Sequence, residues 1–266
     1  MKKMIIACTC LLAACTAKQL TNTNTTATSS SIAINGKLFT TLFQQKAAEY
    51  RALCFQAYNV ARYRLDEYKP LTSKPKAIIT DIDETLLDNS PYEAHRVMQG
   101  KDYDAPSWNE WTAKGSADTI PGAASFLKYA ASKGVTIFYV TNRDEKERAG
   151  TIQNLKRFDL PNADDAHFMP RKGSSSKEAR RQSVFSTHEI VLYLGDNLAD
   201  FSALFDKKSP DERLRNTNFS AADFGNRFIV LPNPVYGDWE SSLFNYNYNY
   251  TQAQKDSVIR SVLKGY

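Results

Sequence analysis

The stretch KAIITDIDETLLDNS, residues 76–90, decides the fold of this chain. It opens with the short apolar run Ala77–Thr80, which is typical of a strand covered on both faces. Two carboxylates, Asp81 and Asp83, follow the run at once. In open α/β sheets, binding sites form beyond the carboxyl ends of the strands. The stretch therefore predicts a buried parallel strand that delivers acidic side chains to a site.

Three further apolar runs rich in β-branched residues match the first and predict three more strands. They cover residues 135–140, 190–194 and 228–231, and helical patterns lie between them at 123–132, 145–158 and 175–186. This order predicts an open α/β sheet with helices on both faces. The helical pattern at 37–68 and an insertion at 88–120 predict a smaller, mostly helical cap.

The predicted strands end in polar side chains that we expect to converge at one edge of the sheet. These are Asp81, Asp83, Thr141, Asn142, Asp196 and Asp200. Two carboxylates about 4 Å apart repel by about 4 kcal/mol at an effective dielectric constant near 20, so a cation must offset the charge. Oxygen donors without His or Cys favour a hard ion, and we expect Mg²⁺.

The N-terminus has the pattern of an export signal. Two lysines precede an apolar stretch that is too short to span a bilayer, which indicates a signal peptide over residues 1–14. The tetrapeptide Leu12–Cys15 resembles a bacterial lipobox, which implies lipid attachment at Cys15; the alternative is a plain secretory signal. Polar residues 15–36 predict a flexible tether. We therefore expect a lipid-anchored protein of the bacterial cell envelope, at the outer membrane.

Composition and charge narrow the possible partners. The chain has 266 residues, of which 42% are hydrophobic and 24% charged, as in ordinary globular proteins. The formal net charge of +5 comes from scattered residues, so no nucleic-acid polymer is expected as a partner. Once the predicted signal is removed and Cys15 is lipidated, Cys54 is left alone and no intrachain disulfide is possible. The oligomeric state stays open.

The motifs occur in an order that resembles the haloacid dehalogenase superfamily. DIDET at 81–85, the strand end VTN at 140–142, a downstream lysine and GDNLAD at 195–200 resemble its four motifs. Further segments resemble the class C acid phosphatases, a lipoprotein group that includes 5′-nucleotidases. They are DIDETLLDNSPYE, IPGA, VTNR, SSKEARR, GDNLADF and IVLPNPVYGDWE. The resemblance implies a haloacid dehalogenase-like, Rossmann-type domain over residues 37–266.

The resemblance also implies the chemical roles of the converging residues. Asp81 would attack phosphorus, and Asp83 would act as general acid and then as general base. Lys177 would neutralise charge, with Lys172 as the alternative lysine. Thr141 and the Asn142 backbone N–H would bind phosphoryl oxygens. The Mg²⁺ ligands would be Asp81, the main-chain carbonyl of Asp83, and Asp196, with Asp200 holding the water shell or orienting Lys177.

Two aromatic residues are candidates to bind a nucleobase. The resemblance implies a clamp made by Trp108 and Tyr236, although both residues could serve packing instead and Trp111 could replace Trp108. We therefore expect a lipid-anchored, Mg²⁺-dependent phosphomonoesterase acting on small phosphate monoesters, above all 5′-nucleotides. The alternatives are a surface binding or adhesion lipoprotein on a phosphatase scaffold, and a narrow phosphatase for another small ester.

Overall fold

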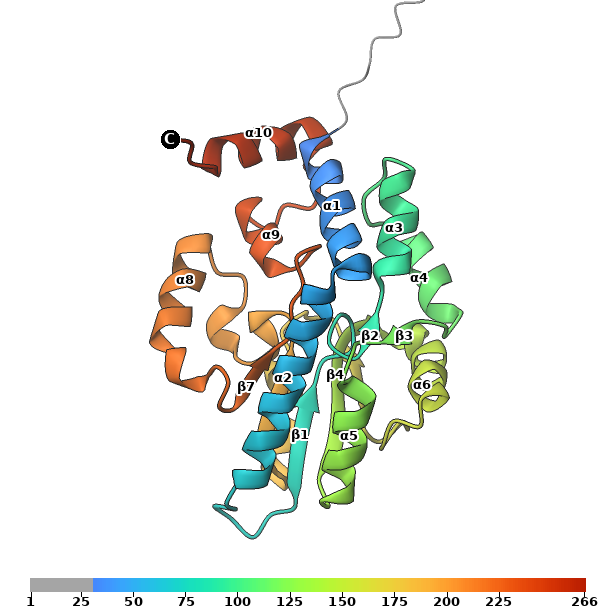
Figure 1. Cartoon of the computed structure of the whole chain (residues 1–266), viewed down its shortest axis with the longest axis vertical. Helices are drawn as coiled ribbons and strands as arrows, with labels where there is room; N and C mark the ends of the chain where they lie inside the picture. The colour runs from blue at the N-terminus through green and yellow to red at the C-terminus, as the bar shows by residue number, and fades with distance from the viewer. Residues whose placement is uncertain (1–30) are drawn as a thin grey trace, which may run out of the picture.

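A computed structural model describes residues 31–266, and a five-stranded parallel sheet forms its centre (Figure 1). The strand order is β5-β4-β1-β6-β7. The strands are β1 (Lys76–Thr80), β4 (Thr136–Asp144), β5 (Phe168–Arg171), β6 (Glu189–Gly195) and β7 (Phe228–Val230). The four predicted strands are confirmed. The sequence patterns missed β5, which is four residues long and contains Pro170; it lies at the sheet edge, where proline is tolerated.

Helices cover both faces of the sheet, as predicted. Alternate residues of β1 point to opposite sides: Ile78 belongs to the larger core, whereas Ala77 and Ile79 pack in a smaller cluster with Val184 of α7. The larger core also contains residues of α2, α5 and α6. These helices are α2 (Ala48–Glu67), α5 (Ala123–Ser132), α6 (Arg148–Arg157) and α7 (Glu178–Thr187). Burial on both faces explains why the strands are nearly continuous apolar runs.

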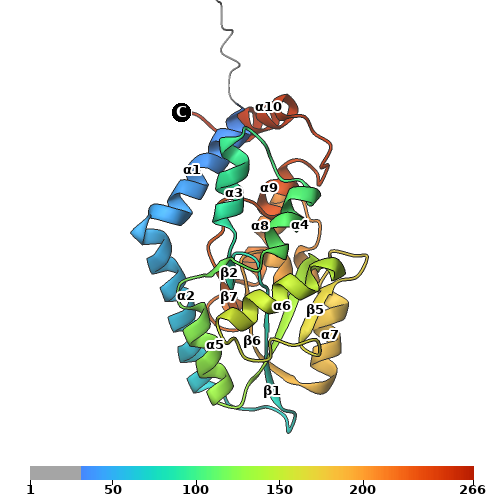
Figure 2. The same ribbon diagram turned by 90° about the vertical axis from the view of Figure 1, so that its right-hand side faces the viewer.

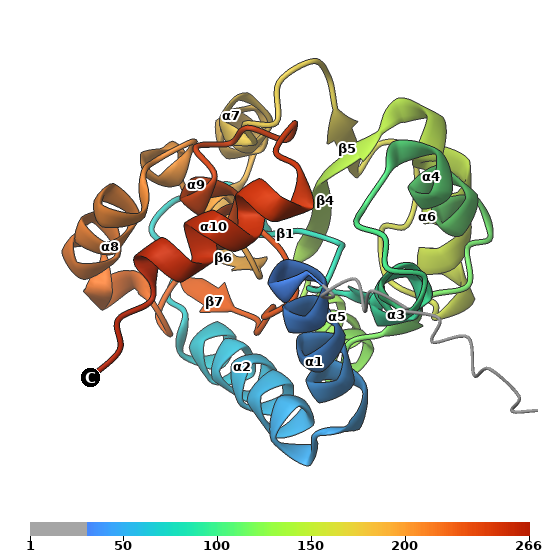
Figure 3. The same ribbon diagram turned by 90° about the horizontal axis from the view of Figure 1, so that it is seen from above.

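The remaining helices gather mainly beyond the carboxyl end of the sheet, where they form the cap (Figures 1 and 2). The cap elements are α1 (Ile32–Lys46), α3 (Ser90–Met98), α4 (Ala105–Ala113), α9 (Asp238–Leu243) and α10 (Gln252–Val262), with the short pair β2 (Leu87–Asp88) and β3 (Asp118–Thr119). Helix α8 (Pro210–Phe219) lies beside the sheet. Figure 3 shows α10 passing above the core next to the start of α1. The helical pattern at 37–68 is in fact two helices, because Ala47 has extended backbone angles.

The predicted flexible tether is wrong for residues 32–36, which form the first turn of α1. Ser31 caps the helix by accepting a hydrogen bond from the Ile34 N–H, and Asp256 of α10 accepts hydrogen bonds from the Ser31 hydroxyl and the Ala33 N–H. Ala33 and Ile34 are buried. This tertiary contact overrides the polar composition. The rest of the tether, the signal peptide and Cys15 lie outside the described residues.

None of the helices that the structure describes is long and apolar enough to cross a membrane.

Candidate active site

Asp81 and Lys177 form the centre of the site. Asp81 follows β1, and its backbone N–H donates to the carbonyl of Leu194 on the neighbouring strand β6 at 2.9 Å. Lys177 stands directly before α7, and its ammonium group contacts Asp81 and lies 2.6 Å from Asp200 Oδ1. All three side chains are buried. The structure therefore brings Lys177, not Lys172, to Asp81.

Asp196 and Asp200 come from the loop after β6 and face Asp81. Carboxylate oxygens of these three residues lie within 4.8 Å of one another. The Asn197 N–H donates to Asp200 Oδ2 at 2.9 Å, which holds the loop tight. Gly195 makes this possible, because a Cβ there would lie 2.5 Å from Asp200. The predicted convergence of these three carboxylates is what the structure shows.

The electrostatics of this cluster suit a bound cation. Burial raises the pKa of Asp81, Lys177 lowers it, and Asp200 and Asp83 raise it further. Burial also raises the pKa of Asp196, with Asp200 and Asp81 adding to the effect. One lysine thus faces three carboxylates. All the donors are oxygen atoms, so the residues fit a hard divalent cation.

Asp83 faces the same pocket but has different partners. Arg143, which is buried, donates to Asp83 Oδ1 at 2.7 Å through its NH2 group and at 3.1 Å through Nε. The Asn89 side chain donates to the same oxygen at 2.8 Å. Two donors therefore fix the orientation of this carboxylate. Arg143 lies within the VTNR segment, but the motif predicts no role for it; its position directly after Thr141 and Asn142 is the signal that could have indicated one.

Thr141 and Asn142 lie within β4, which runs on to Asp144, rather than after the end of the strand as the sequence predicts. The Thr141 hydroxyl is buried and accepts a hydrogen bond from the Arg143 N–H at 3.1 Å. Arg180, another residue without a predicted role, contacts the Thr141 carbonyl and donates to Asn142 Oδ1 at 3.0 Å. Asn142 lines the pocket. Arg180 thus holds the end of β4, which would contact phosphoryl oxygens.

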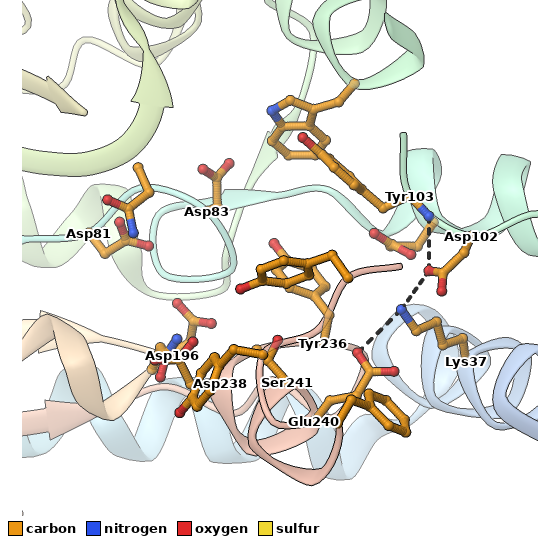
Figure 4. Close-up of a pocket in the computed structure, with 18 of the residues that line it drawn as sticks. Lys37, Asp81, Asp83, Asp102, Tyr103, Asp196, Tyr236, Asp238, Glu240 and Ser241 are labelled. Carbon is orange, nitrogen blue, oxygen red and sulfur yellow. Dashed lines mark hydrogen bonds and ion pairs between the residues drawn. The ribbon is translucent and has the colours of Figure 1, made fainter. Parts of the chain in front are cut away.

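The pocket is a cavity of about 440 Å³ that extends from the carboxylates to the cap. In Figure 4, Asp81, Asp83 and Asp196 lie at one end, and Lys37, Asp102 and Glu240 lie at the other. Trp108 and Tyr236 both line it. Trp111, the alternative to Trp108, instead donates through Nε1 to Asn89 Oδ1 at 2.8 Å and packs against the core. The structure thus places the predicted pair, rather than Trp111, around the cavity.

Together, a parallel sheet with carboxylates after β1 and β6, polar residues at the end of β4 and a lysine before α7 define a phosphatase of the haloacid dehalogenase type. Comparison agrees: residues 3–239 match the family described as HAD superfamily, subfamily IIIB (acid phosphatase), and the chain belongs to that family. The class C acid phosphatase from Bacillus anthracis is similar in structure, with a TM-score of 0.85 and 42% identity, over 88% of this chain and 99% of that one.

Two further comparisons add detail. A second structure of the Bacillus anthracis protein, with tungstate bound, has 41% identity and the same TM-score of 0.85. Acid phosphatase 1 from Solanum lycopersicum is 26% identical over 167 residues, and a stem 31 kDa glycoprotein from Glycine max is 25% identical over 204 residues. These alignments cover 59% and 73% of this chain, and 57% and 67% of the two plant proteins.

Proposed function

We propose that this protein is a lipid-anchored, Mg²⁺-dependent phosphomonoesterase that hydrolyses 5′-nucleotides and other phosphate monoesters through an aspartyl-phosphate. The observation that carries the proposal is the pair Asp81 and Asp83, which leave one strand end and face one pocket while Lys177 contacts Asp81. One carboxylate would attack phosphorus, and the other is held separately by Arg143 to handle protons.

The first half of the reaction transfers the phosphoryl group to the protein. An Asp81 oxygen forms a bond to phosphorus as the bond to the leaving oxygen breaks, and Asp83 donates a proton to that oxygen. In the second half, Asp83 takes a proton from water, the water oxygen bonds to phosphorus, and Asp81 leaves. Lys177 and the backbone at the end of β4 stabilise the charge on the phosphoryl oxygens.

Mg²⁺ would be held by Asp81, Asp196 and the main-chain carbonyl of Asp83. When bound, the ion neutralises the phosphate and polarises its oxygens. Asp200 would hold the water shell of the ion or orient Lys177, and its 2.6 Å contact with the Lys177 ammonium supports the orienting role. The tungstate bound to the Bacillus anthracis relative supports an oxyanion site in this fold.

The nucleotide preference is supported by the aromatic lining of the pocket. Trp108 and Tyr236 present rings to the cavity, and stacking on a base is worth about 1–3 kcal/mol. A cavity of about 440 Å³ has room for a ligand of nucleotide size. The anchor rests on the lipobox at Cys15, and we propose that it holds the protein at the outer membrane of a bacterial cell envelope.

The first test is hydrolysis of 5′-AMP and p-nitrophenyl phosphate by protein that starts at Ser31, compared in Mg²⁺ and in EDTA. We expect activity on both substrates that EDTA abolishes and Mg²⁺ restores. Asp81→Asn removes the nucleophile, and Tyr129→Phe, far from the pocket, serves as the control that keeps full activity.

Turnover retained by Asp81→Asn would refute the nucleophile assignment. A folded, Mg²⁺-loaded wild type without activity on a broad panel of phosphate esters would instead favour the binding lipoprotein. Activity on p-nitrophenyl phosphate without activity on any nucleotide would favour the narrow phosphatase. Mass spectrometry of protein expressed in a bacterial host tests the anchor, because lipidation at Cys15 removes residues 1–14 and adds acyl chains.

A further inference from the structure

Glu84 is a buried carboxyl group that the mechanism above does not use. It follows Asp83 directly, and its side chain is 1% exposed. Its backbone φ is +53°, in the left-handed region that residues with a side chain adopt at a cost. The Glu84 N–H donates to the Leu87 carbonyl at 2.9 Å and closes a tight loop. The strained backbone at Glu84 thus turns this carboxyl group away from the pocket.

The Glu84 carboxyl group connects the pocket wall with the residue that holds Asp83. The Tyr236 hydroxyl contacts Glu84 Oε2, and the Asn89 N–H donates to Glu84 Oε1 at 2.9 Å. The Asn89 side-chain NH₂ then bridges Glu84 Oε2, at 3.3 Å, and Asp83 Oδ1, at 2.8 Å. Hydrogen bonds therefore lead without interruption from Tyr236 to Asp83.

A second connection starts at Trp108, on the other side of the pocket. The guanidinium carbon of Arg143 lies 5.6 Å from the centre of the Trp108 ring, within cation–π range. The same guanidinium holds the Asp83 carboxylate. Trp108 is thus joined to Arg143, and Tyr236 is joined through Glu84 to Asn89. Arg143 and Asn89 are the two donors that orient Asp83. The Trp111 Nε1–H also donates to Asn89 Oδ1, which helps to hold the Asn89 side chain in place.

We infer that Glu84 and Asn89 are positioning residues that couple the occupation of the aromatic pocket to the orientation of the Asp83 carboxylate. A leaving group packed on the Tyr236 ring holds the hydroxyl against Glu84, and this keeps Asn89 on Asp83. The inference rests on the proposed function, since Asp83 must donate a proton to the leaving oxygen. Proton transfer depends on hydrogen-bond geometry, so a carboxylate that loses a donor transfers protons less well.

The test uses two substrates of nearly the same shape that need the proton to different degrees. Phenyl phosphate releases a basic phenolate and depends on a general acid, whereas p-nitrophenyl phosphate releases a stable anion that needs little protonation. The value of kcat/KM reports the steps up to cleavage of the leaving-group bond. The ratio of the two kcat/KM values therefore measures the acid function of Asp83 apart from folding or binding.

Asn89→Ala should lower kcat/KM for phenyl phosphate by about tenfold more than for p-nitrophenyl phosphate. Tyr236→Phe keeps the ring and removes only the hydroxyl, so it should lower the same ratio by about threefold while KM for 5′-AMP changes by less than about twofold. Tyr129→Phe removes a hydroxyl that contacts Asp66 far from the pocket, and it should leave the ratio unchanged.

Equal losses on both substrates in Asn89→Ala and Tyr236→Phe would overturn the coupling, because a structural defect lowers the two rates alike. If Asn89→Ala does not fold, Tyr236→Phe alone decides. A wild type that hydrolyses neither aryl phosphate, nor any other ester, would contradict the proposed function itself. The two failures are therefore distinguishable in one set of measurements.

Discussion

Two clusters of buried and half-buried charged residues line opposite ends of the same pocket, and they are built differently. At the strand ends, Lys177 contacts Asp81 and Asp200, while Asp196 accepts hydrogen bonds from the neutral side chains of Thr85 and Asn233. Negative charge is in excess there, and burial disfavours the ionised carboxylates.

The second cluster, which we call the clasp, joins the cap through Lys37, Asp102, Glu240 and Lys255. The Lys37 ammonium lies 2.8 Å from Asp102 and 3.3 Å from Glu240, and Lys255 lies 2.5 Å from Asp102. These residues come from α1, the loop after α3, α9 and α10. Two lysines balance two carboxylates without any ligand. This fold thus balances charge where it joins elements and leaves charge unbalanced where a metal and a phosphate would bind.

The largest effect should come from Asp81→Asn, which should abolish turnover and also stabilise the protein. Loss of the nucleophile should lower kcat by at least about 10⁴-fold. Removal of one buried carboxylate should raise the unfolding free energy in EDTA at pH 8 by about 1–3 kcal/mol, because burial disfavours its ionised form. Thermal unfolding of the wild type and of Asp81→Asn in EDTA measures this stability. A lower unfolding midpoint for Asp81→Asn would contradict the difference between the strand-end cluster and the clasp.

Lys37→Met should have the opposite signature. The substitution leaves Glu240 without its lysine and Asp102 with Lys255 alone, so it should lower the unfolding free energy by about 3 kcal/mol. The turnover of p-nitrophenyl phosphate at saturation should stay within about threefold of wild type, since Lys37 lies at the far end of the pocket. Urea unfolding with an activity assay checks both. Lys46→Met at the exposed end of α1 is the matched control, and equal stability of the two variants would contradict the clasp.

Gly195→Ala should damage the site through a steric clash, without adding or removing a charge. The new methyl group would lie 2.5 Å from Asp200 and push that carboxylate away from Lys177. We expect kcat to fall by about 100-fold and the Mg²⁺ concentration needed for activity to rise by about tenfold. Titration with Mg²⁺ measures this. Gly36→Ala, where no atom lies within 4 Å and the backbone φ is not positive, is the control for the exchange of glycine for alanine.

The sequence predicted the strand-end cluster because its residues adjoin local patterns. Asp81 and Asp196 each follow an apolar run directly, so parallel strands bring them together regardless of the rest of the fold. Neither position required knowledge of a tertiary contact. The positions of Thr141 and Asn142 followed in the same way.

The clasp and the network around Asp83 could not be predicted in this way. Lys37 and Lys255 are more than 200 residues apart, and neither lies in a motif. Their contacts depend on how α1 and α10 pack across the cap, which is tertiary information. The same packing explains why residues 32–36 form a helix where the sequence predicted a flexible tether. Arg143 lay within a quoted motif, but only the structure shows that its guanidinium reaches back to Asp83.

The most gradual effect concerns pH and Glu93, which faces the clasp. Burial raises the pKa of Glu93 from 4.5 to about 7, with Lys37 opposing the shift and Asp102 adding to it. A raised carboxyl pKa stabilises the fold below the unfolded value and loses that contribution as pH rises through the folded value. Between pH 4.5 and 7, Glu93 should therefore lower the unfolding free energy by up to about 1.4 kcal/mol per pH unit. Glu93→Gln should remove that slope in urea unfolding across this range. An unchanged slope in Glu93→Gln would show that Glu93 is already ionised in the folded protein across this range. The two lysines of the clasp would then balance three carboxylates rather than two.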